Sequence, residues 1–327
     1  MNFATLKGLT IPEGVVTQIT DASGRVLWAL KSGGKVILEV EKITSDTYAG
    51  ETTYTAEEFI LLDIYPETNG TVKVTYGGIT KTVKDTGSTD LAGNPNAQQV
   101  YFGTFNGVSD EVPTPESGTL TIEGRFRQFG VGSFKINGES KNSSKYCGCV
   151  TAIADWGGVT AIPAHSFDGC TGLTSITFPD GLQSIGDFAF ANFHKSQGSK
   201  QFDTIVFPEG LLSIGARAFY TDAIFYPYVS GIGSIILPST LQSIGGDAFC
   251  YSYDVEDDGN IDGYQTHVCN ITILATTPPT IGTTYTNGIF GKSAQPALVI
   301  TVPKGCGETY KAADGWSNYA DYITEAE

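Results

Sequence analysis

Basic residues and histidine are scarce in this chain of 327 residues. Against 35 Asp and Glu stand 19 Lys and Arg, which gives a formal net charge of -16. Such a charge excludes nucleic acid and anionic lipid as favourable partners, because like charges repel. The three histidines, His165, His194 and His267, lie in no catalytic motif, and the sequence has no G-x-S-x-G, H-E-x-x-H or phosphate-binding glycine loop. We therefore predict that the protein is not an enzyme.

Long apolar runs are missing as well. No segment approaches 18 consecutive apolar residues, which excludes a membrane-spanning helix and predicts no membrane insertion. The start, Met1–Lys7, has no basic segment followed by an apolar stretch, so it is not a secretion signal. Two expectations follow: an export signal has been removed, or the protein reaches the outside by another route, such as release with a virion.

Six cysteines in 327 residues are too few for a disulfide framework. We expect buried structural thiols, as at Cys170. The pair Cys147 and Cys149 forms a C-x-C that could ligate a metal, but no second pair accompanies it.

What the sequence does contain is a motif written three times, L-x-S-I-G-x-x-A-F, with copies that end at Phe190, Phe219 and Phe249. A strand-like run ending in proline precedes each copy, and a degenerate earlier copy ends at Phe167. Phe167 to Phe190 is 23 residues, and the later steps are 29, 30 and 41 residues, the last reaching Phe290. A repeat of this length predicts a solenoid. Ile176, Ile205 and Ile235 in the strand-like runs should point inward.

The extra residues of the longer repeats always follow the Ala-Phe pair, so they should project from one side of the stack. They are rich in aromatic residues, which offer large contact areas to a protein or glycan partner. The alternative is that these rings pack over their own loops, and the small residues of the strand face form a second, lower-ranked surface. The predicted binding residues are Phe193, Tyr220, Phe225, Tyr226, Tyr228, Tyr251, Tyr253 and Tyr264.

The segment GCTGLTSITFPDGLQSIGDFAF (Gly169–Phe190) and its echoes resemble the BspA-type leucine-rich repeat. The resemblance covers residues 147–327, and the tail from Leu298 resembles the closing segment of that family. It implies a last strand ending at Pro303, then a short helix that caps the core together with Trp316 and Tyr319. It also implies attachment to a cell surface and contact with protein or glycan, without catalysis and without a cofactor.

Residues 1–33 read as a separate module with two short strands around a turn at Asp21–Gly24. The phrase TQITDASGRVLW (Thr17–Trp28) resembles a leader of structural proteins of tailed bacteriophages of gut bacteria, which implies anchoring to other virion proteins. The alternative is an ordinary β-hairpin that starts the next domain.

Residues 34–137 predict a β-sandwich of immunoglobulin-like shape, because about seven strand-like runs alternate with turns. Among these runs, Thr71–Tyr76 and Ile79–Val83 flank a hairpin signal at Gly77–Gly78, and Thr119–Phe129 reads as one strand. The polar residues 138–146 read as a linker into the repeats. The expected fold class is therefore mainly β: a hairpin module, a sandwich and a leucine-rich-repeat solenoid with a short helical cap.

An acidic stretch from Asp254 to Gln265 partly fits a calcium-binding loop. Asp254, Asp258 and Asp262 would be the Ca²⁺ ligands. Glu256 and Gln265 depart from the template, and no flanking helices are evident. A solvated acidic loop is the alternative.

These observations favour a virion protein, tail- or capsid-associated, that recognises the host surface through its repeats and becomes extracellular on release. Two alternatives remain: a bacterial cell-surface adhesin, or a decoration protein whose solenoid contacts other virion subunits. Homo-oligomerisation is compatible with each.

Overall fold

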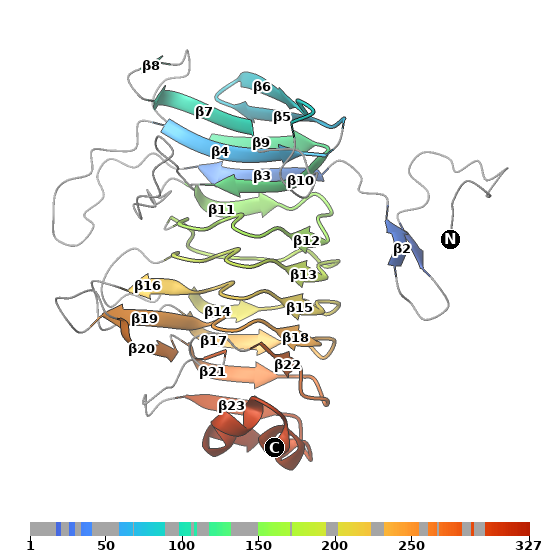
Figure 1. Ribbon diagram of the computed structural model, residues 1–327, viewed down its shortest axis with the longest axis vertical. Coiled ribbons are helices and arrows are strands. Elements are labelled where there is room, and N and C mark those ends of the chain that lie inside the picture. The colour runs from blue at the N-terminus through green and yellow to red at the C-terminus, as the bar shows by residue number, and fades with distance from the viewer. Residues whose placement is uncertain are drawn as a thin grey trace.

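A computed structural model describes residues 18–20, 26–29, 34–40, 59–67, 69–88, 98–105, 108–109, 118–131, 150–170, 172–193, 202–223, 232–254, 261–266, 268–282, 289–290 and 298–327. Within them the chain is mainly β, as predicted, with two short helices near the C-terminus. A column of stacked coils carries two facing sheets at one end and the helices at the other (Figure 1). No helix among the described residues is long and apolar enough to cross a membrane.

The two strands expected in the N-terminal module are present. They are β1 (Gln18–Thr20) and β2 (Val26–Ala29), which pair antiparallel. Within the described residues this pair forms a sheet of its own.

Two sheets make up most of the region predicted as a sandwich. One has the order β10-β4-β7-β8, the other β11-β3-β9-β5-β6. Rings from both sheets meet between them, since Tyr76 contacts Phe102 edge-on with centroids 5.7 Å apart. An immunoglobulin-like topology stays a prediction. The strands are β3 (Gly34–Val40), β4 (Phe59–Pro66), β5 (Thr71–Tyr76), β6 (Ile79–Lys84), β7 (Gln98–Phe105), β8 (Val108–Ser109), β9 (Gly118–Gly124), β10 (Phe126–Val131) and β11 (Val150–Asp155).

The single strand expected over Thr119–Phe129 is wrong, because the chain changes sheets inside it. β9 lies in the five-stranded sheet and β10 in the four-stranded one. The break falls at Gly124, whose φ of 140° and lack of room for a Cβ beside the backbone of Thr71 and Val72 suit only glycine. The sequence shows the glycine, but the alternation of Leu120, Ile122 and Phe126 continues across it, so the change of sheet is not evident from the sequence.

The two-sheet region and the repeats share one core. β11, which follows the predicted linker, pairs antiparallel with β3. Phe129 of β10 contacts the first repeat phenylalanine, Phe167, edge-on at 5.5 Å. Trp156 also contacts Phe167 and donates a hydrogen bond to the carbonyl of Thr177. The two-sheet region therefore closes the N-terminal end of the solenoid, and the predicted linker, residues 138–146, lies outside the described residues.

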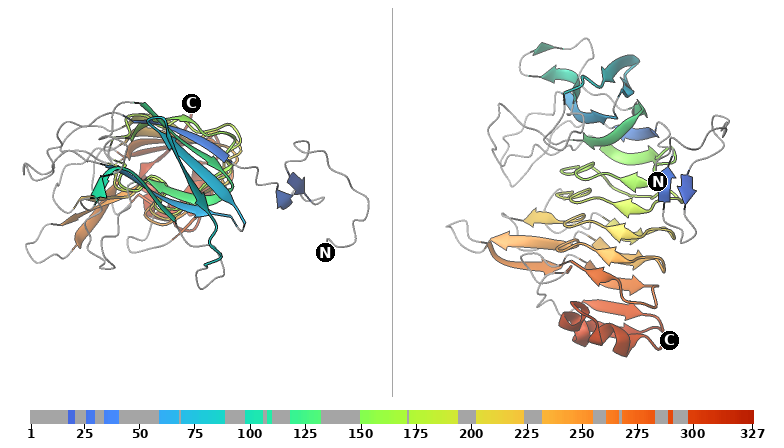
Figure 2. Two further views of the ribbon diagram at one scale, coloured as in Figure 1. Left: turned by 90° about the horizontal axis from the view of Figure 1, so that it is seen from above. Right: turned by 45° about the vertical axis from the view of Figure 1, so that its right-hand side comes forward.

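The solenoid has two parallel sheets, one along each long side of the coils (Figure 2). The Ser-Ile pairs of the motif form the first sheet, in register from coil to coil. It contains β12 (Ala161–Ile162), β13 (Ser184–Ile185), β15 (Ser213–Ile214), β18 (Ser243–Ile244) and β22 (Thr280–Ile281). The second sheet contains β14 (Phe202–Val206), β17 (Ile232–Leu237), β21 (Val268–Ile273), β23 (Val299–Val302) and β24 (Ile323–Glu325).

The prediction of inward isoleucines is confirmed for Ile205 and Ile235, which are buried, while Ile176 is partly buried at the edge of the same core. The motif phenylalanines form a continuous ladder of stacked rings. Centroids are 5.2 Å apart from Phe167 to Phe190 and from Phe190 to Phe219, then 5.4 Å and 5.8 Å on the way to Phe290. Each ring thus covers the next, which explains why the residue type repeats.

The predicted C-terminal cap is confirmed. β23 ends just before Pro303, and α1 (Gly307–Ala312) and η2 (Trp316–Tyr322, a 3-10 helix) follow it. Tyr319 meets Phe290 edge-on at 5.5 Å and accepts a hydrogen bond from its amide. Trp316 donates to the carbonyl of Pro279, and burial raises the pKa of Tyr310, which donates to the carbonyl of Ala275. The ladder of stacked phenylalanines is therefore covered by an aromatic ring at each end: Phe129 of β10 at the N-terminal end and Tyr319 of the helical cap at the C-terminal end.

Candidate functional site

The insertions of two successive repeats join in a small sheet on one side of the solenoid. β16 (Thr221–Ala223) pairs parallel with β19 (Cys250–Asp254), which pairs antiparallel with β20 (Ile261–Thr266). The three strands lie beside the column of coils, at its left in Figure 1. This sheet, called the insertion sheet below, joins the insertion that follows Phe219 to the insertion that follows Phe249.

Two of the predicted binding aromatics are corrected, because the structure buries them. Phe193 is fully buried and contacts Phe202 with centroids 5.2 Å apart, so the two rings close the base of the first insertion. Tyr220 is 7% exposed, and the guanidinium of Arg217 lies over its ring at 5.0 Å. Both residues hold insertions to the coils instead of offering surface to a partner.

Three other predicted residues lie on the insertion sheet. The register places Tyr251 between Thr221 and Gln265, and Tyr253 between Ala223 and Gly263. Tyr264 pairs with Ser252. Positions 251 and 253 therefore share one face of the sheet and position 264 lies on the other, since residues alternate along a strand. Phe225, Tyr226 and Tyr228 lie outside the described residues.

The acidic stretch proposed for calcium joins two strands of a hairpin. Asp254 ends β19 and pairs with Ile261, and Asp262 follows in β20. Asp258 lies outside the described residues, among which no group of three or more His, Cys, Asp or Glu gathers as a metal site would require. Calcium binding at Asp254, Asp258 and Asp262 stays a prediction.

Cys170 is buried, as expected, and so is Cys250, whose thiol donates to the carbonyl of Ile289. Cys306 is partly exposed, and none of these three cysteines forms a disulfide among the described residues. Cys147 and Cys149 lie outside the described residues.

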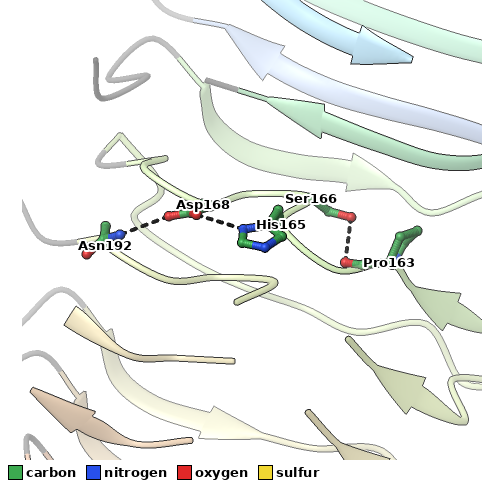
Figure 3. Close-up of polar contacts among 5 residues, drawn as sticks. All are labelled: Pro163, His165, Ser166, Asp168 and Asn192. Carbon is green, nitrogen blue, oxygen red and sulfur yellow. Dashed lines mark hydrogen bonds and ion pairs between the residues drawn. The ribbon is translucent and has the colours of Figure 1, made fainter. Parts of the chain in front are cut away.

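A polar cluster that the sequence did not single out lies on the first two coils (Figure 3). The Nδ1 of His165 is 3.0 Å from one carboxylate oxygen of Asp168, and the side-chain amide of Asn192 donates to the other at 2.9 Å. Ser166 is buried, and its hydroxyl donates to the carbonyl of Pro163. Because Ser166 is turned toward that carbonyl instead of the imidazole, the cluster is not a Ser-His-Asp triad.

The imidazole of His165 also belongs to a column that runs along the coils. His165, Phe188, Arg217 and Asp247 occupy the same place in successive repeats, two residues before the ladder phenylalanine, and all have φ between 55° and 58°. His165 stacks on Phe188 at 4.9 Å, Arg217 covers the same ring at 5.6 Å, and Arg217 pairs with buried Asp247 at 3.4 Å. These four side chains contact one another from coil to coil. The position two residues before each ladder phenylalanine therefore serves packing between the coils and not a reaction.

Comparison with protein families matches residues 140–256 to six copies of the BspA type Leucine rich repeat region. The repeats within residues 140–256 are BspA-type leucine-rich repeats, and a domain of this kind indicates a surface adhesin or recognition protein. A comparison with curated proteins found no match.

Proposed function

We propose that this chain, whose repeats are of the BspA type, is a non-enzymatic recognition protein that binds a protein or glycan of a host-cell surface through its repeat insertions. The observation that carries the proposal is the insertion sheet. It fixes two insertions from different repeats against each other on a rigid column of coils. Ordered loops on a rigid scaffold lose less entropy on binding than free loops do.

The closed ends of the ladder support the same role. Phe129 covers the ladder at its N-terminal end and Tyr319 at its C-terminal end, so the repeat column is anchored at both ends. A recognition surface on such a body keeps a fixed orientation relative to the rest of the chain. A fixed orientation is an advantage for an adhesive protein on a larger particle, because several copies can then bind the same cell surface at once.

The insertion sheet gives a direct test. Replacing Tyr251 and Tyr253 together with Ala should weaken binding to host cells at least tenfold, since truncating a central interface tyrosine costs on the order of 1–2 kcal/mol. The matched control is Leu212→Ala, which removes an exposed apolar residue of the same column away from the insertion sheet. Binding is measured by flow cytometry with labelled protein. Equal binding by all three proteins would contradict the proposed surface.

In its finer form, the proposal is that the protein is part of a bacteriophage virion, with residues 1–33 joined to other virion proteins. The leader phrase in Thr17–Trp28 supports this, and its two strands are consistent with a short docking module. In this reading the two-sheet region sets the distance between the particle and the repeats. The protein is then extracellular once virions are released.

Deleting residues 1–33 should abolish incorporation into particles without unfolding the rest. β1 and β2 pair only with each other among the described residues, and the shared core begins with β3 at Gly34. The expected result is a truncated protein with an unchanged melting temperature that is missing from purified virions on immunoblots. Normal incorporation of the truncation would remove the anchoring role.

A bacterial surface adhesin is the main alternative, and the repeats fit it equally well. It predicts a secretion signal in the parent gene. A decoration protein is the other alternative, and it predicts that Tyr251→Ala with Tyr253→Ala disturbs particle assembly instead of cell binding.

A further inference from the structure

The strand β24 lies at the C-terminal end of the second solenoid sheet. It pairs parallel with β23, which places Glu325 beside Val302. Just after the strand, the amide of Ala326 donates to the carbonyl of Val302 at 2.8 Å. Among the described residues no further strand pairs with β24. β24 therefore covers the edge of β23, and its detachment would open that edge to water.

The side chain of Glu325 ties this strand to the start of the helical cap. Its Oε2 accepts a hydrogen bond from the amide of Gly305 at 2.9 Å, and its Oε1 accepts one from the amide of Gly307 at 2.8 Å. Gly305 lies in the turn after β23, and Gly307 begins α1. One carboxylate thus connects β24 with both the turn and the helix, through contacts that are not part of the β-sheet pairing.

The backbone of this turn is shaped to receive the carboxylate. Gly305 has a φ of 79°, a conformation that favours glycine. A Cβ on Gly307 would lie 2.6 Å from Oε1 of Glu325, so only glycine leaves room for the carboxylate there. Backbone amides that converge in this way form a concave site for an anion. Here the anion is a side chain of the protein itself.

We propose that Glu325 is an acid-sensitive latch that holds β24, and with it the helical cap, on the end of the solenoid. The term latch is used below for the two hydrogen bonds from Gly305 and Gly307 to this carboxylate. The latch works independently of what the insertions bind, so it does not depend on the proposed function.

The surroundings of the latch favour its charged form. The amides of Gly305 and Gly307 hold the pKa of Glu325 below its ordinary value, and the nearby charges of Lys311 and Lys304 lower it further. The other titratable groups around the latch are few. Glu308 of α1 pairs with Lys311 at 3.4 Å, Cys306 lies between the two glycines, and β23 contains no titratable residue.

The direction of the pH dependence follows from the lowered pKa. The latch stabilises the fold fully at pH values above the ordinary glutamate pKa of about 4.3. Its contribution is lost as the pH falls through the lower pKa of the folded protein, because a protonated carboxyl is a weaker acceptor for both amides. We therefore expect β24 to be held at neutral pH and released in acid.

Hydrogen exchange measured by mass spectrometry on the full chain tests the latch. Glu325→Gln should lower the protection factors of residues 323–326 at pH 7 by at least about fivefold. In the wild type, protection factors corrected for intrinsic exchange rates should fall by a similar factor between pH 7 and pH 3, roughly the range over which the carboxyl is protonated. The matched control is Glu308→Gln, since the Glu308 side chain is 93% exposed and pairs only with Lys311 in the same helix. Amides of β5 in the two-sheet region serve as the internal reference.

Gly307→Ala reaches the latch by a second route. The added methyl group should push the carboxylate of Glu325 away and reproduce the loss of protection at pH 7, although alanine otherwise favours a helix. Unchanged protection of residues 323–326 in Glu325→Gln, equal loss in Glu308→Gln, or higher protection in Gly307→Ala would each overturn the latch. If a variant does not fold, the wild type still decides: a pH-dependent loss no larger in residues 323–326 than in β5 would overturn it as well.

Discussion

Replacing Phe219 with Ala is expected to lower the free energy of unfolding by about 3–5 kcal/mol. Phe219 stands in the middle of the ladder, stacked on Phe190 at 5.2 Å and on Phe249 at 5.4 Å, and it meets Phe207 edge-on at 5.6 Å. Removing the ring leaves a cavity that the coils cannot close, because their backbones are tied to each other by inter-coil hydrogen bonds such as that from the amide of Phe219 to the carbonyl of Ala248. Chemical denaturation monitored by circular dichroism measures the loss.

Phe219→Leu keeps most of the volume and should cost about half as much or less, so it remains measurable if the alanine variant does not fold. Leu212→Ala is the surface control and should change stability by no more than about 0.5 kcal/mol. A loss below about 1 kcal/mol for Phe219→Ala would contradict a close-packed ladder. The two-sheet region shares this core with the repeats. We therefore expect both regions to unfold in a single transition of the circular dichroism signal.

Gly245→Ala should cost about 3 kcal/mol or more, although it adds only one methyl group. A Cβ on Gly245 would collide with the backbone of Ala216 and Gly215 in the preceding coil. Gly215 meets Asp187 in the same way, at 2.5 Å. Backbone atoms cannot turn aside as a flexible side chain can, so the coils would have to move apart. This explains why glycine follows the Ser-Ile pair in each copy of the motif.

Gly181→Ala is the matched control for Gly245→Ala. Gly181 lies at a turn of the same solenoid, and the nearest atom to its Cβ would be the Thr160 methyl at 4.0 Å, an ordinary contact. Its replacement should be neutral or slightly stabilising, because alanine lowers the entropy of the unfolded chain. Melting temperatures of the two variants against the wild type decide the matter. Similar values for both would show that coil spacing does not exclude a side chain at position 245.

The candidate site was only partly predictable from the sequence. The position of the insertions after each Ala-Phe pair predicts that they project from one side, and the insertion sheet agrees with that. The aromatic residues in them were harder to place, since Phe193 and Tyr220 have the same composition signal as an exposed ring but are buried. Burial depends on how side chains are placed: Phe202 meets Phe193 across the first insertion, and the guanidinium of Arg217 folds over the ring of Tyr220.

The sequence alone determined the solenoid, its inward isoleucines and its repeating phenylalanine, whereas the C-terminal cap was predicted from the resemblance to the BspA-type family. It could do so because each coil repeats one local pattern, and coils of one pattern can bury their apolar side chains only by stacking. The tertiary structure alone decided how the ends and insertions meet: β11 joins β3, Phe129 covers Phe167, and β16 pairs with β19. Those contacts join segments with no shared pattern and depend on where the folded coils bring them in space.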